Sequence, residues 1–92
     1  MIEIGDLKKQ IESTIKALEL KKRSSGEPVI DDYIHKYQSV LSFIQSGEPR
    51  DVVIKKSQSI LNCVRGYMET SSDYQQEFLK EMGNTEKIIK QL

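Results

Sequence analysis

The sequence predicts an all-α protein, an antiparallel bundle of three to four helices that forms a single domain over residues 1–92. Apolar residues recur at three- and four-residue steps, as on the buried face of a helix, and no segment shows the sustained alternation typical of a strand. The tetrapeptide SGEP occurs at 25–28 and again at 46–49. Glycine in the left-handed conformation ends a helix and proline suits the first turn of the next one. Each copy therefore predicts a short connector between antiparallel helices.

The first two predicted helices flank the first SGEP copy. The helix at 2–23 carries an apolar stripe made of Ile4, Leu7, Ile11, Ile15 (with Thr14) and Leu18. The helix at 28–46 carries a stronger stripe made of Ile30, Tyr33, Ile34, Tyr37, Val40, Leu41 and Ile44. Residues 1–23 hold six basic and four acidic groups, whereas residues 24–47 hold one basic and three acidic groups. This asymmetry predicts complementary helix surfaces, and a steering patch for a partner is the alternative.

The third and fourth predicted helices span 49–69 and 73–91. The sequence TSSD at 70–73 separates them because its short polar side chains compete for backbone hydrogen bonds, and Ser72 with Gln75 fits a capping box. An alternative is a three-helix arrangement in which these two helices are nearly continuous. Gly83 interrupts the last stripe, so either the helix breaks near 83–84 or a neighbouring backbone approaches closely.

The apolar stripes predict a set of core residues. These are Ile11, Ile15, Leu18, Ile34, Tyr37, Leu41, Ile60, Val64, Phe78 and Met82. If Leu41 is buried, Leu41→Ala should cost about 2–5 kcal/mol of stability.

Composition excludes several classes of protein. Lys plus Arg and Asp plus Glu both number 14, and a net charge of zero argues against direct nucleic-acid binding. No apolar run approaches the length of a membrane span, and the N-terminus lacks a secretory signal. Cys63 is the single cysteine, which favours a reducing, cytoplasmic location over a disulfide-forming compartment.

The sequence offers no set of residues for catalysis, so a non-enzymatic protein without a cofactor or metal is expected. His35 is the single histidine and lies off the apolar stripe, as a solvated side chain would. Cys63 lies between apolar helix positions, which predicts a buried, inert thiol. The five glycines are scattered and form no phosphate-binding loop.

A small group of residues in 64–83 is required neither by the predicted core nor by the caps. Glu69, Asp73, Tyr74 and Glu77 place negative charge beside an aromatic ring at one end of the bundle. Tyrosine is favoured at protein interfaces because it combines rigid apolar area with a polar tip. We therefore predict that these residues contact a protein partner, with the acidic face around Asp31 and Asp32 as the next choice.

The run RGYMETSSDYQQEFLKEMGNTEKIIKQL, residues 65–92, resembles the C-terminal part of small helical immunity proteins of bacterial polymorphic or contact-dependent toxin systems. The resemblance covers less than a third of the chain. It implies a protein that binds and neutralises a cognate toxin domain, often a nuclease with a basic cleft. The alternative is a structural or assembly protein that acts as a helical homodimer. The adjacent apolar residues Val40-Leu41, Val52-Val53-Ile54 and Ile88-Ile89 favour it, because a small bundle cannot bury every one.

Overall fold

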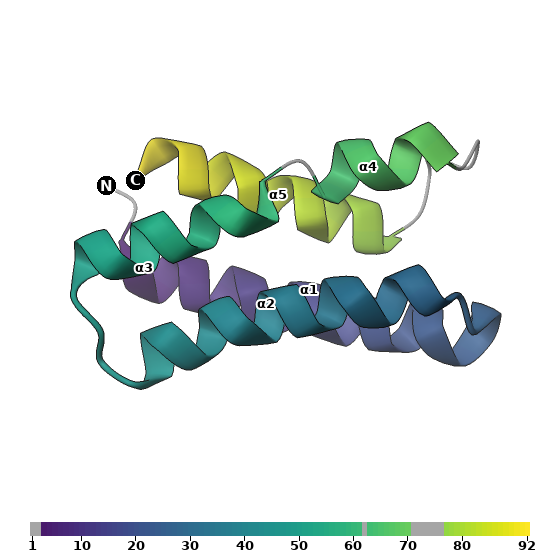
Figure 1. Ribbon diagram of the computed structural model, residues 1–92, viewed down its shortest axis with the longest axis horizontal. Helices are drawn as coiled ribbons and strands as arrows, with labels where there is room; N and C mark the ends of the chain where they lie inside the picture. Colours follow the sequence, from purple (N-terminus) through teal and green to yellow (C-terminus); the bar gives the residue numbers. More distant parts are fainter. Residues whose placement is uncertain (1–2, 62, 71–76) are drawn as a thin grey trace.

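The computed structural model describes residues 3–61, 63–70 and 77–92, and these residues form helices that pack together without a strand. In chain order the helices are α1 (Ile4–Ser25), α2 (Pro28–Gln45), α3 (Arg50–Ser57), the 3₁₀ helix η1 (Gln58–Ile60), α4 (Cys63–Thr70) and α5 (Glu77–Gln91). α1 packs mainly against α2 and α5. In Figure 1, α3, η1 and α4 follow one another along the length of the bundle. α1 begins at the same end of the bundle at which α5 finishes. The predicted all-α bundle is confirmed.

Both SGEP tetrapeptides form connectors. Gly26 has φ 65° and Gly47 has φ 75°, the left-handed conformation that glycine adopts without strain. The Gly26 N–H donates to the Lys22 carbonyl at 2.9 Å and so satisfies one of the last carbonyl groups of α1. Pro28 is the first residue of α2, whereas Pro49 is the N-cap of α3. The connectors turn the chain back on itself, and α1 and α2 lie side by side (Figure 1).

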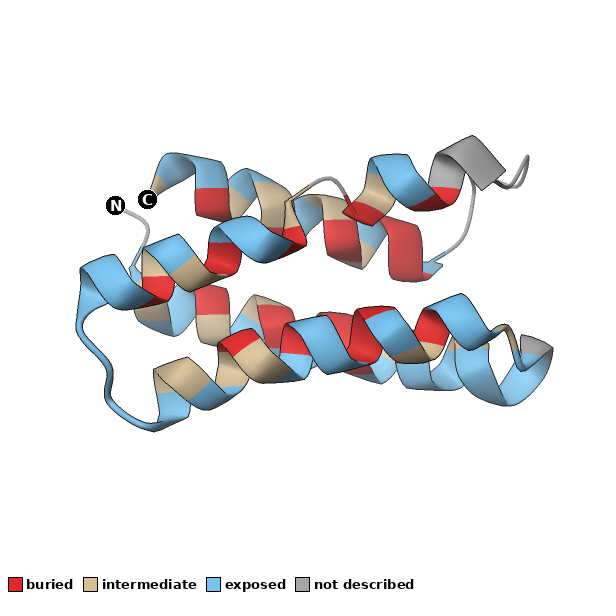
Figure 2. Ribbon diagram, viewed as in Figure 1, coloured by how far each residue is buried: buried red, intermediate tan, exposed pale blue. Residues whose placement is uncertain are grey.

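A cluster of buried apolar side chains joins the helices, and Figure 2 shows the buried residues turned toward the space between them. Most predicted core residues belong to this cluster, but Leu41 and Val64 are only half-buried at its edge. Val40 takes the core position in α2 because it is in helical phase with Tyr33 and Tyr37. The predicted cost of Leu41→Ala assumed a buried side chain and therefore does not apply.

The prediction of one helix over 49–69 is wrong, because Leu61 has an extended backbone (φ −64°, ψ 145°) between η1 and α4. Ser57 is fully buried, and its hydroxyl donates to the Ile54 carbonyl at 2.8 Å. A hydroxyl that competes for a carbonyl favours tight turns over continued α-helix. After the break, the Val64 N–H donates to Glu86 Oε2 of α5 at 3.2 Å. A carboxylate from another helix thus satisfies an N–H group in the first turn of α4.

The region around the last predicted turn is described in part. Residues 71–76, which include the expected Ser72–Gln75 capping box and the start of the helix predicted at 73–91, lie outside the described residues. α4 and α5 pack side by side and do not form one continuous helix (Figure 1).

Neither outcome expected at Gly83 is found. α5 continues through this residue without a break. Apart from Gly83, its two chain neighbours and the nearby backbone of α5 itself, no atom of the described structure lies within 4 Å of the place where a Cβ would stand. The helix is held through Gly83 by the buried residues on either side of it, Leu79, Met82 and Ile89.

A polar network at the α1–α5 contact fixes how these two helices align. The Thr14 and Thr85 side chains are fully buried, and their Oγ1 atoms lie 2.8 Å apart. Thr85 Oγ1 also donates to the Glu81 carbonyl at 2.9 Å. Gln10 Nε2 donates to the Glu81 carbonyl and to Glu81 Oε2, each at 3.0 Å. Because buried polar groups need their partners, a shift of α5 along α1 would break several bonds together.

Candidate functional site

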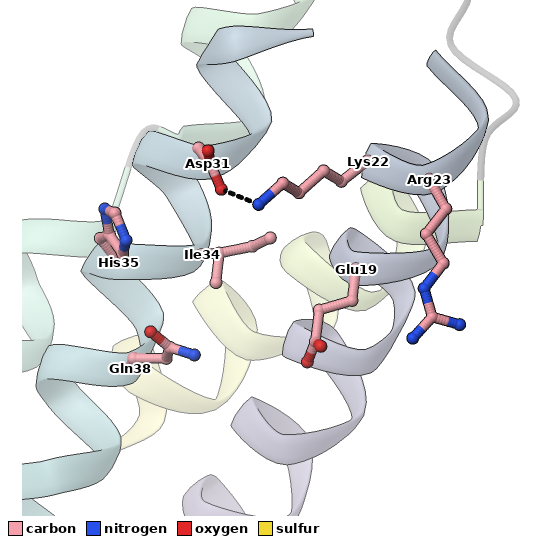
Figure 3. Close-up of a pocket in the computed structure, with 7 residues that line it drawn as sticks. All are labelled: Glu19, Lys22, Arg23, Asp31, Ile34, His35 and Gln38. Atoms are coloured by element: carbon pink, nitrogen blue, oxygen red, sulfur yellow. Dashed lines mark ion pairs between the residues drawn. The ribbon is translucent and has the colours of Figure 1, made fainter. Parts of the chain in front are cut away.

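The ion-pair groove, of about 430 Å³, lies between α1 and α2. Its described lining residues are Glu19, Lys22, Arg23, Asp31, Ile34, His35 and Gln38. Figure 3 shows the Lys22 side chain reaching from α1 to Asp31 on α2, with Ile34 directed into the space between the helices. The Arg23 guanidinium points away from this pair.

The ion pair joins Lys22 Nζ to Asp31 Oδ1 at 2.7 Å. The hydrogen bond from Lys22 lowers the pKa of the Asp31 carboxyl group below its usual value. Both side chains are about half exposed, so water screens the attraction and the pair contributes little to stability. The pair is one contact between a basic group of α1 and an acidic group of α2, the kind of contact that the charge asymmetry predicted. The described lining includes no hydroxyl or thiol that could act as a nucleophile.

The Leu20 groove, of about 340 Å³, lies between the end of α1 and the start of α5. Its described lining residues are Ala17, Leu20, Lys21, Ser24, Glu77 and Phe78. Leu20 is 59% exposed, the largest exposed fraction among the large apolar side chains of the described residues. Lys21 Nζ lies 5.9 Å from the centroid of the Phe78 ring, within the range of a cation–π contact. The groove therefore combines an exposed leucine with one charge of each sign.

An aromatic cluster supports the wall of the Leu20 groove from the inside. The rings of Phe78 and Tyr67 meet edge to face with centroids 5.0 Å apart, and Tyr33 stacks edgewise on Tyr67 at 6.4 Å. The Tyr67 hydroxyl donates to Glu27 Oε2 at 3.3 Å, which connects α4 to the α1–α2 connector. Burial raises the pKa of the Tyr33 phenol. The Phe78 ring is thus fixed by its contact with Tyr67 in the core and also lines the Leu20 groove.

The predicted contact residues are placed only in part. Glu77 is exposed and lines the Leu20 groove. Glu69 belongs to α4, but its side chain lies outside the described part of the structure, as do Asp73 and Tyr74 entirely. Leu20 was not predicted from the sequence. The sequence feature that could have indicated it is the position of Leu20, two residues beyond Leu18 and on a different side of the helix from the apolar stripe.

The acidic face that was the second choice is partly occupied. Asp31 is tied to Lys22, whereas Asp32, its neighbour, is exposed.

Neither Cys63 nor His35, the other two groups considered for chemistry, lines the Leu20 groove. Cys63 is a free cysteine, 6% exposed, which confirms that its side chain is buried, and burial raises the pKa of its thiol. His35 is exposed on α2, as predicted. Among the described residues, no group of three His, Cys, Asp or Glu side chains could hold a metal ion. None of the described helices is both long and apolar enough to cross a membrane.

A third groove, the Lys55 groove, of about 310 Å³, lies between α2 and the α3–η1 segment. Its described lining residues are Phe43, Val52, Lys55, Lys56 and Ser59. Its lining residues belong to the last part of α2 and to α3 and η1, whereas those of the Leu20 groove belong to α1 and to the start of α5.

Comparison with known proteins relates nearly the whole chain to one family. A family model described as "YeeD uncharacterised protein" matches residues 2–92. The uncharacterised protein YeeD of Bacillus subtilis (strain 168) is 28% identical over 89 residues, which cover 94% of this chain and 88% of that protein. No solved structure matches the chain.

Proposed function

The chain belongs to the YeeD family of uncharacterised proteins, and we propose that it is a non-enzymatic protein-binding module. Its most concrete form is an immunity or inhibitor protein that binds and neutralises a cognate bacterial toxin domain in the cytoplasm. The observation that carries the proposal is the Leu20 groove, where an apolar side chain is 59% exposed beside Glu77. The resemblance of residues 65–92 to immunity proteins supports the same reading.

The Leu20 groove has the composition of a partner-binding surface. A partner side chain placed against Leu20, which is 59% exposed, would remove apolar area from water, and this is the main favourable term in protein association. Glu77 at the rim would attract a basic surface such as the cleft of a nuclease. Because the Phe78 ring is already fixed by Tyr67, its ordering adds little to the entropy lost on binding.

Two of the groups that could take part in catalysis are engaged or buried, which supports the proposal of a non-enzymatic protein. The Asp31 carboxylate is engaged by Lys22, and the Cys63 thiol is buried with a raised pKa. A general base or nucleophile needs an accessible group with a pKa near the working pH.

The proposal is tested with the toxin domain encoded beside this gene, by calorimetry and by association kinetics on the purified proteins. Leu20→Asp should weaken binding at least about tenfold, because it places a charge where apolar contact is needed. The matched control is Val29→Asp: Val29 is 36% exposed but does not line the groove. Equal effects of the two substitutions, or no toxin gene beside this one, would count against the proposal.

Substitutions of the charged and of the aromatic residues at the same surface should affect different quantities, the association rate and the binding energy. Glu77→Lys should slow association and flatten its salt dependence, whereas Glu12→Lys on the exposed face of α1 should not. If Tyr74 anchors a pocket of the partner, Tyr74→Ala should cost about 2 kcal/mol or more of binding energy. Binding as tight as the parent for Tyr74→Ala combined with Glu77→Lys would place the contact surface elsewhere.

A helical homodimer remains the second proposal, supported by apolar side chains that the bundle leaves partly uncovered. Val52 is 38% exposed, and Leu41 and Ile88 are half-buried next to fully buried neighbours. Sedimentation velocity at micromolar concentration separates the two proposals. A strict monomer would remove the homodimer as the primary function.

A further inference from the structure

The Lys55 groove offers apolar side chains in a concave setting. Val52 is 38% exposed, and Phe43 is half-buried on the facing part of α2. Val52, Lys55, Lys56 and Ser59 recur at three- and four-residue steps, so α3 and η1 present them along one side. A single apolar side chain of a partner could therefore contact Phe43 and Val52 together.

The charge of this groove has one sign. Its described lining includes two lysines and no carboxylate. Lys56 Nζ lies 5.4 Å from the centroid of the Phe43 ring, which holds the ammonium group at the groove. Asp51, the acidic residue in the first turn of α3, is outside the lining. Because the chain as a whole has no net charge, this local excess of positive charge stands out.

We propose that the Lys55 groove binds an acidic segment of a partner protein, with an apolar side chain against Phe43 and Val52 and carboxylates beside Lys55 and Lys56. This surface is separate from the Leu20 groove, so the proposal does not rest on the proposed function. The combination of an apolar anchor and flanking opposite charge is how grooves select one kind of helix or peptide over another.

Two other occupants fit the same surface less well. A helix that lies on a membrane needs a broad protruding apolar face, whereas here Phe43 is half-buried in a groove and α3 has eight residues. Nucleic acid needs a larger basic surface than two lysines provide in a chain of zero net charge.

The test is a nuclear magnetic resonance titration of the isotope-labelled full chain with three short helical peptides. One carries glutamates and leucines at helical spacing, the second replaces its leucines with alanine, and the third replaces its glutamates with lysine. We expect only the first to shift the amide signals of Phe43, Val52 and residues 55–59.

The double substitution of Lys55→Glu with Lys56→Glu should weaken binding of the first peptide at least about tenfold. The matched control, Lys16→Glu with Lys87→Glu, changes exposed lysines on α1 and α5 and should leave it unchanged. Circular dichroism checks that each variant remains folded.

Several results would overturn the proposal. Absence of shifts at the groove with the first peptide would do so, as would equal binding of the alanine or lysine peptide. Shifts of the same amides by phosphatidylserine vesicles, without any by the first peptide, would assign the surface to a membrane. Shifts that grow with protein concentration alone, matched by dimerisation in sedimentation velocity, would assign it to a second copy of the chain.

Discussion

The hydroxyl group of Tyr37 is buried without a hydrogen-bond partner among the described residues. Burial raises the pKa of this phenol far above its ordinary value, so it stays neutral at every physiological pH. A hydroxyl that has given up water and gained no partner destabilises the folded state. Tyr37→Phe should therefore leave the free energy of unfolding unchanged or raise it by up to about 1 kcal/mol, measured by urea denaturation.

The chain contains a matched control for this prediction. The Tyr67 hydroxyl donates to Glu27 Oε2 at 3.3 Å, so Tyr67→Phe removes a bond together with the hydroxyl. It should cost about 1 kcal/mol. A larger loss for Tyr37→Phe than for Tyr67→Phe would mean that the buried hydroxyl is satisfied in solution.

Gly83 is a second residue at which the change of a single atom, the addition of a Cβ, should alter the stability of the protein. It has helical neighbours on both sides and open space where a Cβ would stand. Gly83→Ala should stabilise the protein by about 0.5–1 kcal/mol, because alanine loses less backbone freedom on folding. Gly26→Ala is the contrasting variant: its φ of 65° strains any residue with a Cβ, so it should destabilise. Thermal and urea denaturation measure both, and destabilisation by Gly83→Ala would show that the space is filled in solution.

At the scale of the elements, α4 is a short helix whose first turn is held by a side chain from another helix. It has eight residues, follows the extended Leu61, and depends on Glu86 of α5 to satisfy the Val64 N–H. Glu86→Ala removes both that acceptor and a negative charge at the positive end of the helix dipole. We expect α4 to open more often, and the Cys63 thiol, 6% exposed when α4 is docked, to report it.

The measurement is the rate at which a thiol reagent labels Cys63 under native conditions. A loss of about 1 kcal/mol should accelerate labelling about fivefold in Glu86→Ala. Labelling should depend weakly on urea, since a local opening exposes little surface. Glu12→Ala removes an exposed carboxylate from α1 and should leave the rate unchanged. An unchanged rate in Glu86→Ala would mean that Glu86 does not hold α4.

At the scale of the whole molecule, the buried cluster contains side chains from each α-helix of the described residues and from η1. Helices that share one core unfold together. The chain has four tyrosines and no tryptophan, and Tyr33, Tyr37 and Tyr67 are buried in that core. Far-UV circular dichroism and tyrosine absorbance should therefore show coincident unfolding transitions in urea. An earlier transition in either signal would reveal an element that melts by itself.

Much of this architecture could be predicted from apolar spacing and turn residues, because helix phase and left-handed glycines are local properties. The break after Ser57 could not, since Val53, Ile60 and Tyr67 keep the spacing of a continuous helix through it. Thr85 and Glu86 gave no signal either, because their partners lie on other helices. Of the candidate site, Glu77 was predicted from the sequence. Leu20 could not be predicted, because it borders a groove only when α5 lies beside α1.

The position of the chain ends has a practical consequence for measuring these two surfaces. α1 begins and α5 finishes at one end of a bundle whose longest dimension is 36 Å (Figure 1). The Leu20 groove is lined by residues from the end of α1 and the start of α5, which lie away from that end. The Lys55 groove lies near the α2–α3 connector, on the side of the termini. A sensor-chip tether or a bulky fusion domain at either terminus would leave the Leu20 groove accessible and crowd the Lys55 groove. Untagged protein is therefore the material for peptide titrations, whereas immobilised protein suits the search for a toxin partner.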